Sequence, residues 1–178
     1  MSRITIINGH PHDDPDHFVH ALASTYAKAA EAAHEVRIIQ VARLDFPILR
    51  DPEDWKSGDV PAGLRAAQED ISWADHLVFL YPLWLGDVPA LLKAFVEQVS
   101  RPGFAIEPGR NGLFRKLLKG KSARIIVTMG MPAMAYRVFF RGHSVKSLKR
   151  NVLNFVGVSP VRISLIGNVE SAAAHRKK

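Results

Sequence analysis

Residues 76–99 read HLVFLYPLWLGDVPALLKAFVEQV, which places an apolar run, a short loop and a helical pattern in direct succession. The run over 76–81 shows little alternation of polar and apolar side chains, as is typical of a strand buried on both faces of a parallel sheet. After the loop, apolar residues recur at three- and four-residue spacing, which indicates an amphipathic helix. Pro89 lies near the first turn of that helix, where a proline costs little.

The same succession of apolar runs and helical patterns extends along the whole chain. Strands are expected over 4–8, 36–41, 76–81, 124–128 and 161–166, and helices over about 18–33, 61–73, 88–100 and 144–156. Residues 45–60 read as an irregular excursion, and no linker divides the chain. This pattern predicts an α/β fold with a doubly wound, five-stranded parallel sheet, built as a single domain over 1–178.

Composition narrows the class of protein. The chain has 178 residues, no cysteine and a formal net charge of +7. Without cysteine neither disulfides nor thiolate chemistry is available, which favours a cytoplasmic location. No apolar run approaches the ~18 residues of a membrane span, and the chain starts with strand-like RITIIN, so we expect no signal peptide. The basic residues lack interleaved stacking aromatics, which favours a solvated face or an anionic ligand over a nucleic acid.

The loop after the first expected strand, GHPHDDPDHF (9–18), gathers three histidines and three aspartates. Such residues bind zinc, and the segment is similar to the His-Pro-Asp-Asp-Glu signature of zinc-dependent N-deacetylases. His12 is inserted, however, the glutamate is missing and no His-x-Asp-His element follows, so we expect no metal. The other candidates are a phosphate site at the N-terminus of the helix that begins near His17, and capping of that helix by Asp14 or Asp16.

Large apolar side chains follow the third expected strand, at the sheet edge where doubly wound folds bind ligands. Tyr81, Leu83 and Trp84 are compatible with core positions that reach a neighbouring helix. Gly86 and Gly130, however, allow backbone in the loops after the third and fourth strands to approach a flat ligand closely. Two apolar, glycine-bearing loops at one edge suit an aromatic ring system whose polar atoms are bound by backbone groups.

Several of these segments together resemble one family. YPLWLGDVPALLKAFVEQV resembles the isoalloxazine-binding loop and following helix of the NAD(P)H:quinone oxidoreductases, which are flavodoxin-like flavoproteins. GHP and DHFVHAL resemble its first-strand loop, with His17 in place of the usual serine, and RPGFAI, VTMGMPAMAYRVFFRGH and VKSLKRNVLNFVGVSPVRISLIG resemble later segments in order, over residues 3–168 in all. The resemblance implies a flavodoxin-like sheet of order 2-1-3-4-5 whose last helix is short or missing, because the chain ends soon after Gly167.

The resemblance also implies functional residues. The flavin-binding set is His10, His17, Phe18 and Val19 after the first strand, Pro82, Leu83, Trp84, Leu85 and Gly86 after the third, and Thr128, Met129, Gly130 and Met131 after the fourth. Tyr136 and His143 are implied as catalytic residues that assist charge and proton movement, although His143 could instead cap the helix that begins near Ser144. Phe104, Trp84 and Tyr136 are implied to line the acceptor pocket.

The implied activity is that of an NAD(P)H dehydrogenase (quinone)-like enzyme, which passes hydride from NAD(P)H through a bound flavin to a flat acceptor such as a quinone. FMN is preferred over FAD, because the chain stops where an adenine-covering region would follow. We expect a homodimer with the flavin at its interface, no nucleic acid and no membrane span. The alternatives are a zinc-dependent N-deacetylase using the GHPHDD loop, and a non-enzymatic flavin-binding regulatory or carrier protein.

Overall fold

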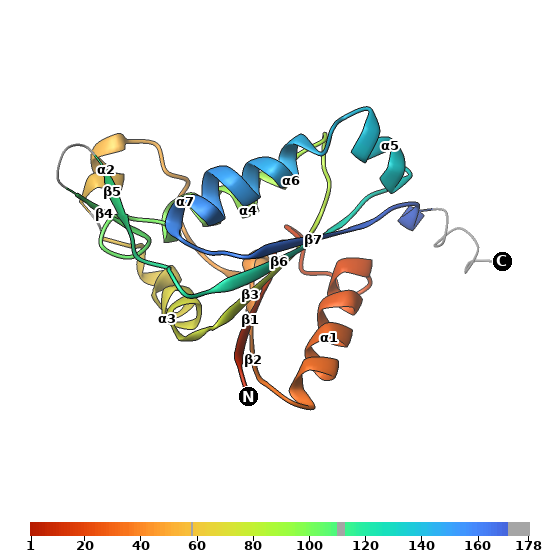
Figure 1. The fold of residues 1–178 in the computed structure, drawn as a ribbon, viewed down its shortest axis with the longest axis horizontal. Helices are drawn as coiled ribbons and strands as arrows, with labels where there is room; N and C mark the ends of the chain where they lie inside the picture. Colours follow the sequence, from red (N-terminus) through yellow and green to blue (C-terminus); the bar gives the residue numbers. More distant parts are fainter. Residues whose placement is uncertain (58, 110–112, 171–178) are drawn as a thin grey trace.

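A computed structural model describes residues 1–57, 59–109 and 113–170 of the chain. Five parallel strands form one sheet in the order β2-β1-β3-β6-β7 (Figure 1). Their bounds are Arg3–Asn8 for β1, Glu35–Gln40 for β2, His76–Pro82 for β3, Ser122–Thr128 for β6 and Val161–Ile166 for β7. Because β4 and β5 belong to a separate hairpin, this order is the expected 2-1-3-4-5, and the predicted flavodoxin-like topology is confirmed.

The expected helices are present with small differences at their ends. Two are regular: α1 spans Phe18–Glu31 and α4 spans Ala90–Val99. The helix expected over 61–73 begins as the 3-10 turn η2 (Ala62–Leu64) and continues as α3 (Arg65–Trp73). The helix expected over 144–156 consists of α6 (His143–Ser147), a π-helical stretch η4 (Leu148–Leu153) and α7 (Asn154–Val156).

Other elements were not predicted. A short helix α2 (Pro52–Lys56) interrupts the segment 45–60 that was expected to be irregular. It forms because the Asp51 side chain accepts a hydrogen bond from the backbone of Glu53 at 2.9 Å and Pro52 occupies the first turn. The remaining additions are the 3-10 turn η1 (Val41–Arg43), the hairpin of β4 (Ile106–Pro108) and β5 (Phe114–Lys116), and helix α5 (Ala133–Val138).

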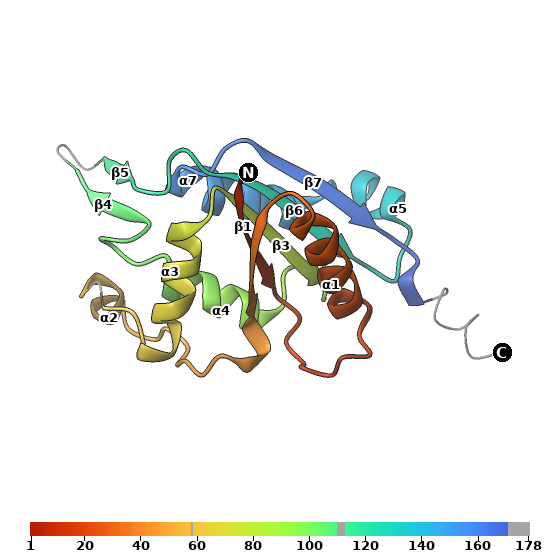
Figure 2. The same cartoon turned by 90° about the horizontal axis from the view of Figure 1, so that it is seen from below.

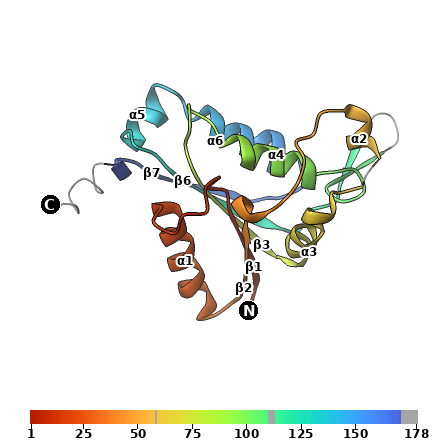
Figure 3. The same ribbon diagram turned by 180° about the vertical axis from the view of Figure 1, so that it is seen from behind.

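Helices cover the two faces of the sheet unequally (Figures 1 and 3). The larger core joins the sheet to α3, α4 and the α6–α7 segment, and its fully buried members include Ile7, Phe95 and Ile125. The smaller core joins the other face to α1. The expectation of a short or missing last helix concerns residues 171–178, which lie outside the described residues. Within the described ranges, no helix is long and apolar enough to cross a membrane.

The topology brings three loops to one edge of the sheet. In a parallel sheet the carboxyl ends of all strands point the same way, and β1, β3 and β6 are consecutive neighbours. Asn8 pairs with Leu80, and Pro82 pairs with Thr128, so the three strands end almost level. The β4–β5 hairpin projects from the end of the molecule far from α5 (Figure 2). The candidate site therefore lies where the loops after β1, β3 and β6 meet.

Candidate functional site

The loop after β3 is a tight reverse turn that carries its apolar side chains outward. The Trp84 amide donates to the Asp87 carbonyl at 3.0 Å, and the Asp87 amide donates back to Trp84 at 2.9 Å. Between them, Leu85 and Gly86 have φ of 47° and 80°, as in a type I′ turn. Trp84 is 50% exposed and Leu85 is fully exposed. The interpretation of Trp84 as a core side chain is therefore wrong, because the turn directs it away from the interior.

Three histidines of the loop after β1 and one in the first turn of α1 lie close together. His10 is 6% exposed, and its ring stacks on that of His17 with the ring centroids 4.0 Å apart. His20, one turn further along α1, lies 5.2 Å from His10, and Trp84 meets His10 edge-on at 5.9 Å. The loops after β1 and β3 are thus in contact. Burial is the main influence on His10 and lowers the pKa of its imidazole below the usual value.

Helix α1 begins without a side-chain cap. Its N-cap residue is His17, whose side chain makes no capping hydrogen bond. The Asp14 side chain instead accepts from the Asp16 amide at 3.0 Å, and this bond lowers the pKa of the Asp14 carboxyl. The proposed capping of α1 by Asp14 or Asp16 is therefore wrong. In the described part of the chain, the amides of Phe18 and Val19 donate no hydrogen bond, which is the arrangement that binds anions at helix N-termini.

The loop after β6 is held from behind by the segment after β7. The Met129 amide donates to the Ile166 carbonyl at 2.9 Å, and the carbonyls of Met129 and Met131 accept from Val169 and Asn168, both at 3.2 Å. Thr128 and Met129 are buried. The amides of Gly130 and Met131, like those of Leu85 and Gly86, find no acceptor among the residues that the structure describes. Backbone donors therefore remain available on two neighbouring loops.

Gly130 has an acidic neighbour, Glu170, that was not predicted from the sequence. A Cβ placed on Gly130 would lie 2.9 Å from each carboxylate oxygen of Glu170. This carboxylate occupies space directly over the loop after β6. A ring that stacks on Gly130 requires the Glu170 side chain to move aside.

Tyr136 and His143 do not share one surface. Tyr136 is 1% exposed, and its hydroxyl accepts a hydrogen bond from the Val145 amide at 3.4 Å. His143 begins α6 and is exposed. The N-cap of α6 is Gly142, and no side chain caps it, so the alternative role of His143 as a helix cap is wrong. Tyr136 thus braces the start of α6, and His143 faces solvent next to it.

Phe104 lies apart from the other expected site residues. It follows α4, which runs from the carboxyl edge of the sheet toward the opposite edge. There it lines a shallow pocket with Asp59, Val60, Arg65, Gln68, Glu69 and Ser72. One chain therefore does not bring Phe104 and Trp84 into a single pocket.

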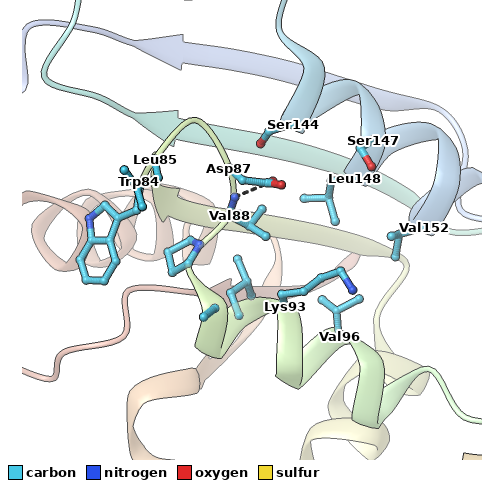
Figure 4. A pocket seen from close by; sticks show the side chains of 13 residues that line it. Trp84, Leu85, Asp87, Val88, Lys93, Val96, Ser144, Ser147, Leu148 and Val152 are labelled. Carbon is cyan, nitrogen blue, oxygen red and sulfur yellow. Dashed lines mark hydrogen bonds between the residues drawn. The ribbon is translucent and has the colours of Figure 1, made fainter. Parts of the chain in front are cut away.

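A pocket of about 450 Å³ opens beside the loop after β3, between α4 and the α6–η4 segment (Figure 4). Apolar side chains form most of its wall: Val88, Leu92, Val96, Leu148 and Val152. Asp87 and Ser144 add polar groups, and the buried Ser144 hydroxyl has no hydrogen-bond partner among the described residues. The sequence did not predict that Asp87 and Ser144 line one pocket, because the two residues become neighbours only when α4 packs beside α6.

Exposed apolar side chains also lie on α5 and at the two residues that follow it. They are Met134, Val138, Phe139 and Phe140, together with Trp84 and Leu85 on the loop after β3. A concentration of this kind is unusual on a surface that faces only water.

Comparison with known proteins places the chain in a family. The profile of the family described as "Flavodoxin-like fold" matches residues 2–178. The chain belongs to this flavodoxin-like family. An uncharacterized NAD(P)H oxidoreductase of Haemophilus influenzae is 30% identical over 126 residues, which are 69% of this chain and 62% of that protein. The potassium-efflux ancillary protein KefG of an Enterobacter strain is 40% identical over 70 residues, 39% of this chain and 36% of KefG.

Solved structures share the fold of this flavodoxin-like protein. Smu.1420 of Streptococcus mutans superposes with a TM-score of 0.79 at 24% identity, covering 98% of this chain and 93% of that one. The NAD(P)H:quinone oxidoreductase of Methanothermobacter marburgensis gives 0.77 at 21%, covering 94% and 87%. An FMN-dependent NADH-azoreductase of Bacillus anthracis, in complex with FMN, gives 0.70 at 18%, covering 100% of both chains. The family resemblance expected from the sequence is confirmed.

Proposed function

We propose that this flavodoxin-like protein is a flavin-dependent NAD(P)H oxidoreductase that reduces a flat acceptor such as a quinone. The observation that carries the proposal is the set of unpaired backbone amides on three adjacent loops, beside an exposed tryptophan and leucine. A group that offers polar edges to those amides and an aromatic face to Trp84 satisfies both at once. The names of the Haemophilus and Methanothermobacter proteins support the same activity.

The residues present suit FMN. Its phosphate would accept hydrogen bonds from the free amides of Phe18 and Val19 at the start of α1, with the His17 ring alongside. Val19 would contribute only its backbone, because its side chain is buried in the core under α1. His10 would support the site by stacking against the His17 ring, and it would not itself bind the phosphate. The isoalloxazine ring would lie over Trp84 and the glycine-bearing loops after β3 and β6.

A bound flavin would supply the hydride-transfer chemistry, and the protein would supply position and charge stabilisation. The amides of Gly130 and Met131 would donate to the edge of the ring where negative charge develops on reduction. Tyr136, fixed through the Val145 amide, would hold the start of α6 in place. His143, exposed beside it, would exchange a proton with solvent at its imidazole.

We also propose that two copies pair through the apolar surface of α5 and the loop after β3. This pairing would cover Leu85, Phe139 and Phe140, which a single chain leaves exposed. The pocket beside Asp87 and Ser144 would provide the adjoining apolar space.

Colour and turnover test the proposal. Purified protein loaded with FMN should be yellow, should bleach when NADPH is added anaerobically, and should regain colour when a quinone is added. Trp84→Ala should weaken FMN binding or raise the KM for the quinone while leaving the melting temperature nearly unchanged. Phe114→Ala removes an aromatic of similar exposure from the distant hairpin and serves as the control. Absence of FMN binding, or a large loss of stability in Trp84→Ala, would contradict the proposal.

The similarity to KefG favours one alternative, a flavin-binding regulatory subunit. The same experiment separates the two functions. Protein that binds FMN but whose flavin is not reduced by NADH or NADPH would support the regulatory role.

A further inference from the structure

The loop between β1 and α1 concentrates groups that bind metal ions. Residues 10–20 contain four histidines and three aspartates, within a chain whose net charge is +7. From this loop, the flavin site proposed above uses backbone amides and the His17 ring, with the His10 ring stacked beneath it. The remaining imidazoles and carboxylates therefore call for a separate explanation.

Two of the four histidines hold the loop in shape. His20 Nδ1 lies 2.7 Å from the Asn8 side-chain nitrogen, and its Nε2 lies 2.9 Å from the carbonyl oxygen of His12. Nδ1 of His10 lies 2.9 Å from the same carbonyl. Two imidazoles thus fix the main chain of His12 from inside the loop, and both ring nitrogens of His20 are occupied.

The other two histidines face one another at the surface. His12 Nδ1 lies 3.0 Å from His17 Nε2. The Asp14 carboxylate completes the group, since one ligand atom from each of the three residues lies within 4.8 Å of the others. Two nitrogens bound to one zinc ion at a tetrahedral angle lie about 3.4 Å apart. The two rings therefore need to separate by only a few tenths of an ångström to share a cation.

The carboxylates around this pair are not equivalent. Asp13 is committed to Arg43, whose Nε lies 2.8 Å from both carboxylate oxygens. Asp14 accepts one backbone hydrogen bond at Oδ1, and its Oδ2 has no hydrogen-bond partner among the described residues. Asp14 can therefore give one oxygen to a cation without breaking an ion pair.

We propose that His12, Asp14 and His17 form a binding site for one first-row divalent cation, with Zn²⁺ as the best-matched ion. Two imidazoles and one carboxylate favour zinc over magnesium or calcium, which prefer all-oxygen sites. The site is exposed, so solvent supplies the fourth ligand. This departs from the expectation of no metal, because the sequence did not show that the inserted His12 folds back onto His17. The proposal does not depend on flavin binding.

Zinc titration tests the site. Untagged full-length protein, treated with a chelator and dialysed, is titrated with ZnCl₂ by calorimetry, and with CoCl₂ to record visible d–d absorption. We expect one equivalent to bind. Removing a ligand should cost at least as much as the roughly 10- to 100-fold loss that follows disruption of a ligand's supporting contacts, so His12→Gln and His17→Gln should each weaken binding at least tenfold. Asp14→Asn should weaken it by a smaller factor.

Matched controls keep the test specific. His34→Gln removes a histidine outside the loop, and Asp16→Asn makes the same change two residues from Asp14. Both controls should bind zinc as the unaltered protein does. The proposal is overturned if no saturable binding occurs, if His12→Gln and His17→Gln bind normally, or if His34→Gln loses affinity equally. FMN titration of the same proteins is read separately, so failure of the flavin proposal would leave the zinc result interpretable.

Discussion

The backbone of Leu85 adopts a left-handed conformation that is unfavourable for leucine. Its φ is 47°, and its side chain is fully exposed, so it gains no burial in return. A left-handed conformation costs an L-residue about 1–2 kcal/mol, whereas glycine adopts it freely but loses about 0.4–1 kcal/mol through the greater freedom of the unfolded chain. Leu85→Gly should therefore raise the free energy of unfolding by about 0–1.6 kcal/mol, or the melting temperature by up to roughly 5 °C.

Strain of this kind persists in proteins chiefly where a site requires it. If Leu85 is covered by the flavin ring or by a second copy, the substitution removes an apolar contact worth about 1.5–3 kcal/mol. FMN affinity or dimer affinity should then fall by roughly 10- to 100-fold. Without flavin, Leu85→Gly should therefore be at least as stable as the unaltered protein, but its FMN complex or its dimer should be weaker.

Urea unfolding of the flavin-free protein, at two protein concentrations, gives the free energy of unfolding and shows whether it depends on dimer formation. Quenching of FMN fluorescence gives the affinity for FMN. Gly86→Ala is the matched control, because it adds strain in the same turn where a Cβ meets nothing within 4 Å. It should lower stability by about the amount that Leu85→Gly raises it. The argument is refuted if Leu85→Gly destabilises the flavin-free protein by more than about 2 kcal/mol, as truncation of a buried leucine would, or if both affinities are unchanged.

Two further predictions concern charged groups. Burial, and then the nearby Arg124 and Arg162, lower the pKa of His76 below 6.5. The unfolded chain therefore binds a proton at His76 more readily than the folded chain does. The free energy of unfolding should accordingly fall as the pH drops below about 6.5, and it should level off below the folded-state pKa of His76. The variant His76→Gln can still form a hydrogen bond with the Ser122 hydroxyl. In urea unfolding between about pH 5 and pH 8, it should show a weaker dependence of stability on pH. An unchanged dependence would show that groups other than His76 cause it. Glu170→Gln, which removes negative charge over Gly130, should raise FMN affinity about two- to fivefold in the same fluorescence titration; equal affinities would show that the carboxylate moves away without cost.

The pattern of apolar residues was enough to predict those strands and helices that are largely buried. Strand β3 extends only one residue past its predicted bounds, because a strand buried between two layers is apolar along most of its length. In α4 the residues Leu92, Phe95, Val96 and Val99 are buried, as their spacing indicated. Family-like segments then gave the strand order. The α2 helix and the β4–β5 hairpin escaped prediction because they are short and held by local hydrogen bonds, which leave little periodic signal.

Side-chain neighbours were predicted far less well than elements. The sequence singled out His10, His17 and Trp84, and the structure places them in contact. It gave no sign that Ser144 would face a pocket, or that Tyr136 would be buried. Those outcomes depend on how α6 packs beside α4, which is a relation between residues more than fifty positions apart.

By itself the sequence determined the layers of this protein, since hydrophobic periodicity reports directly which faces leave water. It also determined which loops meet at the carboxyl edge, because strand order follows from the family-like segments. Only the tertiary structure decided which groups at that edge remain unpaired. The free amides of Gly86 and Gly130, the strained Leu85 and the facing rings of His12 and His17 arise from backbone geometry in three separate loops. A hydrogen bond or its absence is fixed at the scale of an ångström, and only packing of distant segments sets positions that finely.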